Sequence, residues 1–239
     1  MKNKKLSILL FGILIISLFS CGQTTVEIPK EFIETQAPKV YSDDWHTLNF
    51  SDNEFKVSIL DGKLKIEKNK VTNECELAIS NGKLVGEDLG EWGGTLTFQP
   101  LDTTKSKVEI KRGNIKFIFT FNDKIYFIEG LAYMSSSSGA IFELELKGNK
   151  FTYNKLVDFD DAPEAFTIYN DKWLIATNQK FYVVKDLKKE FIFEDTFWCS
   201  LYPNSIAVLD EENVFIGMRS GIVKLDLTSK TLKFYKNDK

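Results

Sequence analysis

The sequence predicts an all-β domain, and three observations support this fold class. Runs of alternating apolar and polar residues recur from about residue 55 onward, which is typical of strands with one buried face. Short turns rich in Asn, Asp and Gly separate these runs, as they do in tight β-hairpins. No 12-residue stretch of the mature domain shows an apolar stripe with helical spacing.

Five hairpins are expected in order along the chain, each made of two alternating runs joined by a short turn. Asn, Asp and Gly tolerate the positive φ angles that such turns require. In the third hairpin, for example, residues 117–121 lead through the turn into residues 124–128. The five turns are Asp61-Gly62, Asn81-Gly82, Asn122-Asp123, Asn170-Asp171 and residues 210–213.

The spacing of the turns narrows the architecture. From Asn81 onward, successive turns lie 41, 48 and 40 residues apart, and two further alternating runs follow each hairpin. A period of 40 to 50 residues that holds four strands is typical of β-propeller blades. Residues 50–236 therefore resemble the β-propeller superfamily, with four visible four-stranded blades at roughly 74–112, 113–159, 160–195 and 196–236.

This resemblance is one of period and strand pattern. The chain has no WD dipeptide, kelch diglycine pair or YWTD-type signature, so no named propeller family is implied. An N-terminal hairpin at residues 55–67 is left over, and it either forms part of a fifth blade or packs as an edge. A β-sandwich or an irregular barrel is the alternative architecture.

The amino terminus has the pattern of a secretory signal peptide. Three lysines precede an apolar run at residues 6–19 that is too short to span a membrane comfortably. The run ends in Leu18-Phe19-Ser20-Cys21, which resembles the lipobox of bacterial lipoproteins. That resemblance implies a lipid on Cys21 and a place in the bacterial cell envelope, in the periplasm or at the cell surface. An ordinary cleaved signal or an uncleaved anchor is the alternative.

These patterns divide the chain into three parts. We expect a signal peptide at residues 1–20, a lipidated tether at residues 21–50 and the β-propeller-like domain at residues 51–239. The tether segment contains prolines and no sustained period, which is typical of a linker. Alternatively, its apolar residues, such as Val26 and Ile28, strap onto the surface of the domain.

Composition excludes some partners. The whole chain has a net charge of −3, and removal of the lysine-rich leader makes the mature chain more acidic, so nucleic acid is not expected as a partner. Contact with the membrane through the lipid on Cys21 is expected, together with an envelope protein, peptide or glycan, and the protein is expected to be a monomer. Cys75 and Cys199 allow one disulfide, but separate buried thiols are the favoured interpretation.

One face of the predicted ring collects aromatic and charged residues in the loops between blades and between the second and third strands of each blade. Such residues suit a polar ligand that stacks on a ring, such as a sugar or a peptide. For Trp92 and Trp198 the alternative is a place in the core between blades. The predicted ligand-binding residues are Trp92, Asp160, Asp161, Trp198, Tyr202 and Arg219.

No catalytic motif is found. The single histidine, His46, lies near the tether, so neither a Ser-His-Asp arrangement nor a histidine-rich zinc site is expected. We therefore predict no catalytic residues, no metal and no cofactor. The predicted function is an envelope-anchored lipoprotein with a non-catalytic binding or interaction domain. The alternative is a glycan- or cell-wall-acting enzyme that uses paired carboxylates on the same face.

Overall fold

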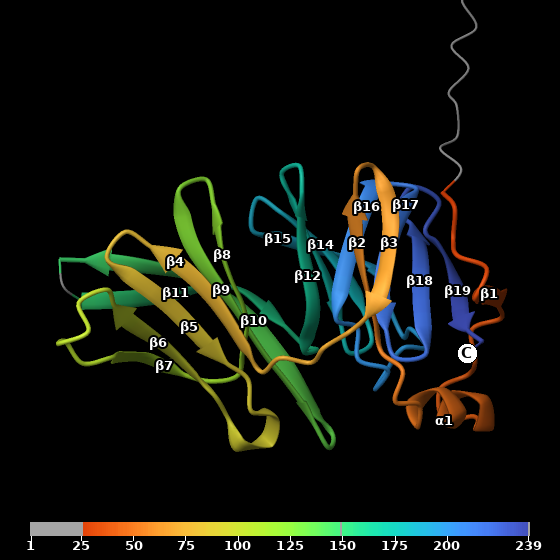
Figure 1. Cartoon of the computed structure of the whole chain (residues 1–239), viewed down its shortest axis with the longest axis horizontal. Coiled ribbons are helices and arrows are strands. Elements are labelled where there is room, and N and C mark those ends of the chain that lie inside the picture. Colours follow the sequence, from red (N-terminus) through yellow and green to blue (C-terminus); the bar gives the residue numbers. More distant parts are fainter. Residues whose placement is uncertain (1–25, 149, 239) are drawn as a thin grey trace, which may run out of the picture.

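The computed structural model of the chain describes residues 26–148 and 150–238, and Cys21 with the predicted signal peptide lies outside them (Figure 1). The described part is all-β apart from the short helix α1 (Asp43–Asn49) and one 3-10 turn, η1 (Gly90–Trp92). None of the helices in this part is long and apolar enough to cross a membrane. The all-β prediction is confirmed.

Most strands form four antiparallel sheets, each built from four consecutive strands. Their limits agree with the four repeats predicted from the turn spacing. Sheet I contains β4 (Glu74–Ile79), β5 (Gly82–Glu87), β6 (Thr95–Pro100) and β7 (Val108–Arg112). Sheet II contains β8 (Ile115–Phe121), β9 (Lys124–Tyr133), β10 (Ser136–Lys147) and β11 (Lys150–Phe159). Sheet III contains β12 (Pro163–Tyr169), β13 (Lys172–Thr177), β14 (Phe181–Lys185) and β15 (Lys188–Phe193). Sheet IV contains β16 (Ser205–Asp210), β17 (Asn213–Met218), β18 (Gly221–Asp226) and β19 (Thr231–Asn237), and β1 (Phe32–Thr35) pairs with β19 as a fifth strand.

The remaining strands, β2 (Phe55–Leu60) and β3 (Lys63–Lys68), form a separate two-stranded hairpin. Its turn has positive φ angles at Asp61 and Gly62, as expected. The turn between β8 and β9 has the same property at Asn122 and Asp123. In sheet I, Ile79 pairs with Gly82, so Ser80 and Asn81 form the turn, one residue earlier than predicted.

Four apolar clusters fill the spaces between neighbouring sheets. Leu84 and Phe127 belong to the cluster between sheets I and II, and Ile128 and Trp173 to the cluster between sheets II and III. Sheets III and IV share the largest cluster, around Trp198. The hairpin packs on sheet IV through Phe55 and Val57. Each sheet therefore buries apolar side chains against the next sheet in chain order.

The first strands of the sheets contact one another in series. β4 contacts β8, β8 contacts β12, β12 contacts β16, and β16 contacts β2 of the hairpin. Residues 69–73, here called the strap, connect the hairpin to sheet I. The strap is fixed at both ends, because Asn69 N donates to Glu54 O at 2.8 Å and Asp88 N donates to Asn73 O at 2.8 Å. Figure 1 shows the strap as the connection from β3 to β4.

Residues 26–50, predicted to lie in the tether, pack against the domain. Val26 and Ile28 contact the cluster between sheet IV and the hairpin, and β1 extends sheet IV. The helix α1 was not predicted, since seven residues are too few for a sustained apolar stripe. Its N-cap is Ser42, whose Oγ accepts from Trp45 N at 3.3 Å, and it buries Trp45 and Leu48. The alternative in which the apolar residues of this segment pack on the surface of the domain therefore describes it.

Candidate functional site

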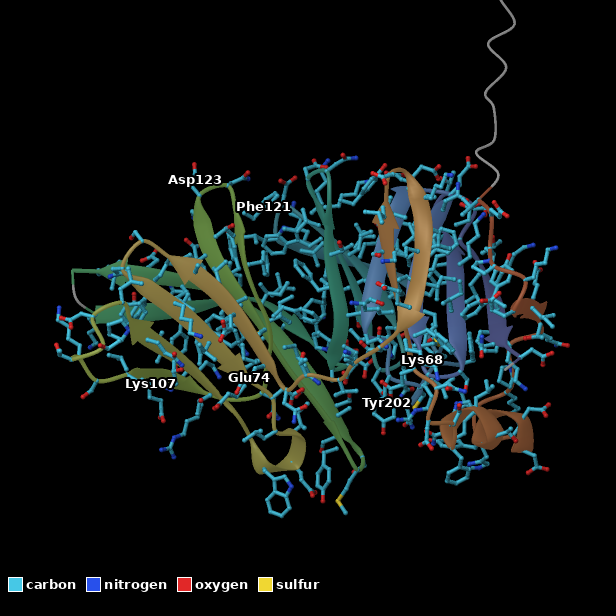
Figure 2. All side chains as sticks on the ribbon, viewed as in Figure 1. Lys68, Glu74, Lys107, Phe121, Asp123 and Tyr202 are labelled. Atoms are coloured by element: carbon cyan, nitrogen blue, oxygen red, sulfur yellow. The ribbon has the colours of Figure 1, made fainter. Side chains whose placement is uncertain are left out.

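A cavity of about 910 Å³ lies where the strap passes between the hairpin and sheet I. The start of β4 and the η1 loop border it on one side, the connection before β16 borders it on the other, and the strap runs from one side to the other. Figure 2 shows Glu74 beside β4 and Tyr202 on the side of the hairpin and β16. The strap and η1, which line the cavity, lie at the end of the domain opposite the turn of β2 and β3 (Figure 1).

Lys116 forms the centre of a charged cluster on one side of this cavity. Its Nζ lies 2.7 Å from Oδ2 of Asp88 and 3.1 Å from Oε2 of Glu164, so the two carboxylates share one ammonium group. The three side chains are largely buried and come from sheets I, II and III: Asp88 follows β5, Lys116 lies in β8 and Glu164 in β12. The contact between first strands thus brings them together.

Burial and charge act in opposite directions on this cluster. Burial of the ammonium opposes its charged form, but the carboxylates of Glu164 and Asp88 outweigh burial and raise the pKa of Lys116. Burial also raises the pKa of Glu164, and the charge of Lys116 offsets only part of that effect. The cluster therefore has a firmly charged lysine and a glutamate that accepts a proton more readily than usual.

Arg219 forms a second charged group on the opposite side. Its Nη2 donates to Oε1 of Glu54 at 2.9 Å, and its Nη1 donates to the carbonyl of Asn49 at 2.8 Å. The guanidinium also lies over the ring of Tyr202, 4.4 Å from the ring centre, as in a cation–π contact. Arg219 Nε and Asn204 Nδ2 are buried donors for which the described residues provide no acceptor.

The rim of the cavity displays a large aromatic side chain. Trp92, in η1, lines the cavity and is 83% exposed. Beside it, the carboxylate of Glu91 accepts a hydrogen bond from Tyr133, at the tip between β9 and β10. Met134 at the same tip is also exposed. Aromatic groups displayed in this way are available to stack on a ligand.

The predicted site residues divide into two groups. Trp92, Tyr202 and Arg219 line the same cavity. Trp198 does not: it is 0% exposed, and its Nε1 donates to the carbonyl of Thr177 at 3.0 Å. Its prediction as a ligand-binding residue is a misassignment, because the connection from β15 to β16 crosses the cluster between sheets III and IV and buries its apolar side chains there.

The adjacent acids also lie outside the cavity lining. Asp161 is 2% exposed and accepts hydrogen bonds from Ser137 Oγ at 2.5 Å, Thr177 Oγ1 at 2.5 Å and Gln179 N at 2.6 Å. It joins sheets II and III. Asp160 points elsewhere, because its carboxylate accepts from Lys180 at 2.8 Å and from Tyr182 at 2.7 Å. Those two hydrogen bonds hold the pKa of Asp160 far below its usual range.

Lys116 and Glu54 were not predicted as site residues. Lys116 lies in a strand and Glu54 directly precedes one, and both are next to apolar residues of that strand. A single charged side chain at such a position is normally solvent-exposed. The sequence feature that could have indicated Lys116 is its position within the otherwise apolar run from Ile115 to Phe119. The contact that makes it important, with Glu164, spans 48 residues of sequence.

Cys75 and Cys199 are both free thiols. Cys75 lies at the edge of the cavity, where burial raises its pKa to about 11. Among the described residues there is no group of three His, Cys, Asp or Glu side chains arranged to hold a metal ion. Comparison with known proteins finds no family model and no curated protein that matches the sequence.

Proposed function

We propose that this protein is an envelope-anchored lipoprotein whose domain binds a peptide or glycan in the cavity beside the strap. The observation that carries the proposal is the combination of a cavity of about 910 Å³ with an exposed Trp92 at its rim. Ligand sites in proteins have volumes of roughly 300–1,000 Å³ and use a few polar groups to orient the ligand. The Lys116 and Arg219 clusters are such groups.

The domain is proposed to be propeller-like. Four consecutive four-stranded sheets whose first strands contact in series support this interpretation. The β2–β3 hairpin packs on sheet IV and would be an incomplete fifth blade. On this interpretation the cavity lies at the seam between the fifth and first blades.

Lipidation at Cys21 would also orient the domain. Val26, which packs against the domain, lies only five positions after Cys21, so the connection spans at most about 18 Å. The described chain begins at the end of the domain that carries the turn of β2 and β3 (Figure 1). Under this proposal, that end faces the membrane and the cavity opens away from it.

The alternative enzyme would use Asp88 and Glu164 as its pair of carboxylates. The raised pKa of Glu164 is a property that a general acid needs. However, Lys116 contacts both carboxylates and occupies the space between them, where a glycosidic bond would have to lie. The geometry therefore supports binding better than hydrolysis.

Titration of the purified full-length protein with soluble peptidoglycan fragments, which carry both glycan and peptide, tests the proposal. We expect saturable binding that Trp92→Ala and Tyr202→Ala each weaken by about 1–4 kcal/mol, as for contact residues of a binding site. Phe191→Ala is the matched control, since Phe191 is exposed on β15 and does not line the cavity. Equal binding by all three variants would refute the proposed site.

A further inference from the structure

The two sides of the cavity carry surplus charge of opposite sign. On the side formed by sheets I, II and III, Asp88 and Glu164 share the ammonium of Lys116, and Glu74 lines the cavity on the same side. Glu74 is exposed at the start of β4, and Figure 2 shows it on this side. Carboxylates therefore outnumber ammonium groups here.

The opposite side has the reverse balance. Arg219 and Lys70 line it together with one carboxylate, that of Glu54. The carboxylate of Glu54 is already paired with Arg219. Lys70 is exposed in the strap, next to Asn69, whose backbone amide donates to the carbonyl of Glu54. The buried donors of Arg219 Nε and Asn204 Nδ2 add unused hydrogen-bonding capacity on this side. A group with acceptor oxygens and negative charge is its natural complement.

We propose that the ligand of this cavity is a short peptide with a free amino group and a free carboxylate. The ammonium group would lie beside Glu74 and Glu164, and the carboxylate beside Arg219 and Lys70. This inference rests on the proposed binding function and selects a peptide over a neutral glycan. Neutral hydroxyl groups would leave the surplus charges of both sides without compensation, which is unfavourable when water is displaced.

Trp92 and Glu164 fit the same ligand. One face of Tyr202 is covered by the guanidinium of Arg219, whereas Trp92 is 83% exposed and offers its ring to an ammonium group or a peptide side chain. Burial raises the pKa of Glu164, and a bound ammonium would favour its ionised form. Affinity for the peptide should therefore increase as pH rises through that pKa. A free peptide stays zwitterionic between about pH 4.5 and 7, so its own titration does not confuse this measurement.

The test compares four probes by isothermal titration of the full-length protein: tetra-alanine, N-acetyl-tetra-alanine, tetra-alanine amide and the neutral sugar N,N′,N″-triacetylchitotriose. We expect tetra-alanine to bind most tightly, with acetylation and amidation each weakening the affinity about tenfold. In Glu74→Gln the effect of acetylation should shrink while the effect of amidation remains. In Lys70→Gln the pattern should be reversed.

Both substituted residues are exposed, so the folded structure should tolerate these changes, and thermal unfolding checks this. Lys63→Gln, in the turn-bearing end of β3, is the matched control and should leave both effects unchanged. Equal affinity for free and blocked peptides would overturn the inference. Binding of the neutral sugar without binding of tetra-alanine would also overturn it, but would leave the proposed binding function intact.

Discussion

Two loops at the same end of the domain each contain a tryptophan, and the two side chains differ in their exposure to solvent. Trp92, in the loop between β5 and β6 of sheet I, is 83% exposed, whereas Trp198, in the connection from β15 to β16, is 0% exposed. Phe197 and Leu201 beside Trp198 are buried as well, whereas Leu89 beside Trp92 is exposed. A loop within a sheet joins adjacent strands, whereas a connection between sheets has to cross their interface. Position relative to the sheets, and not residue type, decides which aromatic is available to a ligand.

The sharpest way to break this comparison is to truncate the two tryptophans in parallel. Trp198→Ala removes a large side chain from the cluster between sheets III and IV and should lower the free energy of unfolding by about 3–5 kcal/mol. Trp92→Ala should change it by less than about 0.5 kcal/mol. Urea unfolding followed by circular dichroism measures both. Similar losses of stability in the two variants would contradict the distinction.

Asp160 and Asp161, in the connection from β11 to β12, allow the same comparison between an exposed and a buried side chain. Asp161→Ala leaves the Gln179 amide without its acceptor and removes the hydrogen bonds that the Ser137 and Thr177 hydroxyls donate, so it should cost about 2–5 kcal/mol. Asp160→Asn removes an ion pair whose carboxylate is 64% exposed, so we expect a loss of no more than about 1 kcal/mol. A larger loss in Asp160→Asn than in Asp161→Ala would reverse our assignment of the two residues.

The contribution of Asp160 should also depend on pH. Its pKa in the folded protein is lowered by Lys180 and Tyr182, so its contribution to stability is present above the pKa of the unfolded chain, near 3.8. It should be lost as pH falls toward the lower, folded-state pKa. The difference in unfolding free energy between wild type and Asp160→Asn should therefore shrink between about pH 5 and pH 2. A difference that grows in this interval would contradict the direction of the shift.

The smallest expected effect concerns the rate at which the two thiols of the described residues, Cys75 and Cys199, are alkylated. Burial raises the pKa of Cys75 to about 11, so little thiolate is present at pH 8 and alkylation of the native protein should be slow. In urea, without reductant, Cys75 and Cys199 should both react rapidly, which gives two reactive thiols per chain when the sulfur of Cys21 carries lipid. Absence of reactive thiols under those conditions would indicate a disulfide and contradict the structure.

Local pattern predicted the strands well, because alternation and turn residues act over a few positions. The limits of sheets I to IV and the turns at Asp61 and Asn122 followed from it. The site was predicted only in part, since its charged clusters join residues far apart in sequence. Arg219 contacts Glu54 across 165 positions, and nothing near either residue indicates its partner. Exposure in the loops, as with Trp198, likewise depends on how sheets pack.

Acrylamide quenching of tryptophan fluorescence tests the central claim most directly. The chain has four tryptophans, of which Trp45, Trp173 and Trp198 are buried and Trp92 is exposed at the cavity rim. We predict that Trp92 accounts for nearly all quenchable emission, that Trp92→Phe removes this fraction, and that saturation with soluble peptidoglycan fragments protects it. Quenching that persists unchanged while bound ligand is demonstrated by isothermal titration would show that the ligand binds elsewhere and contradict the account.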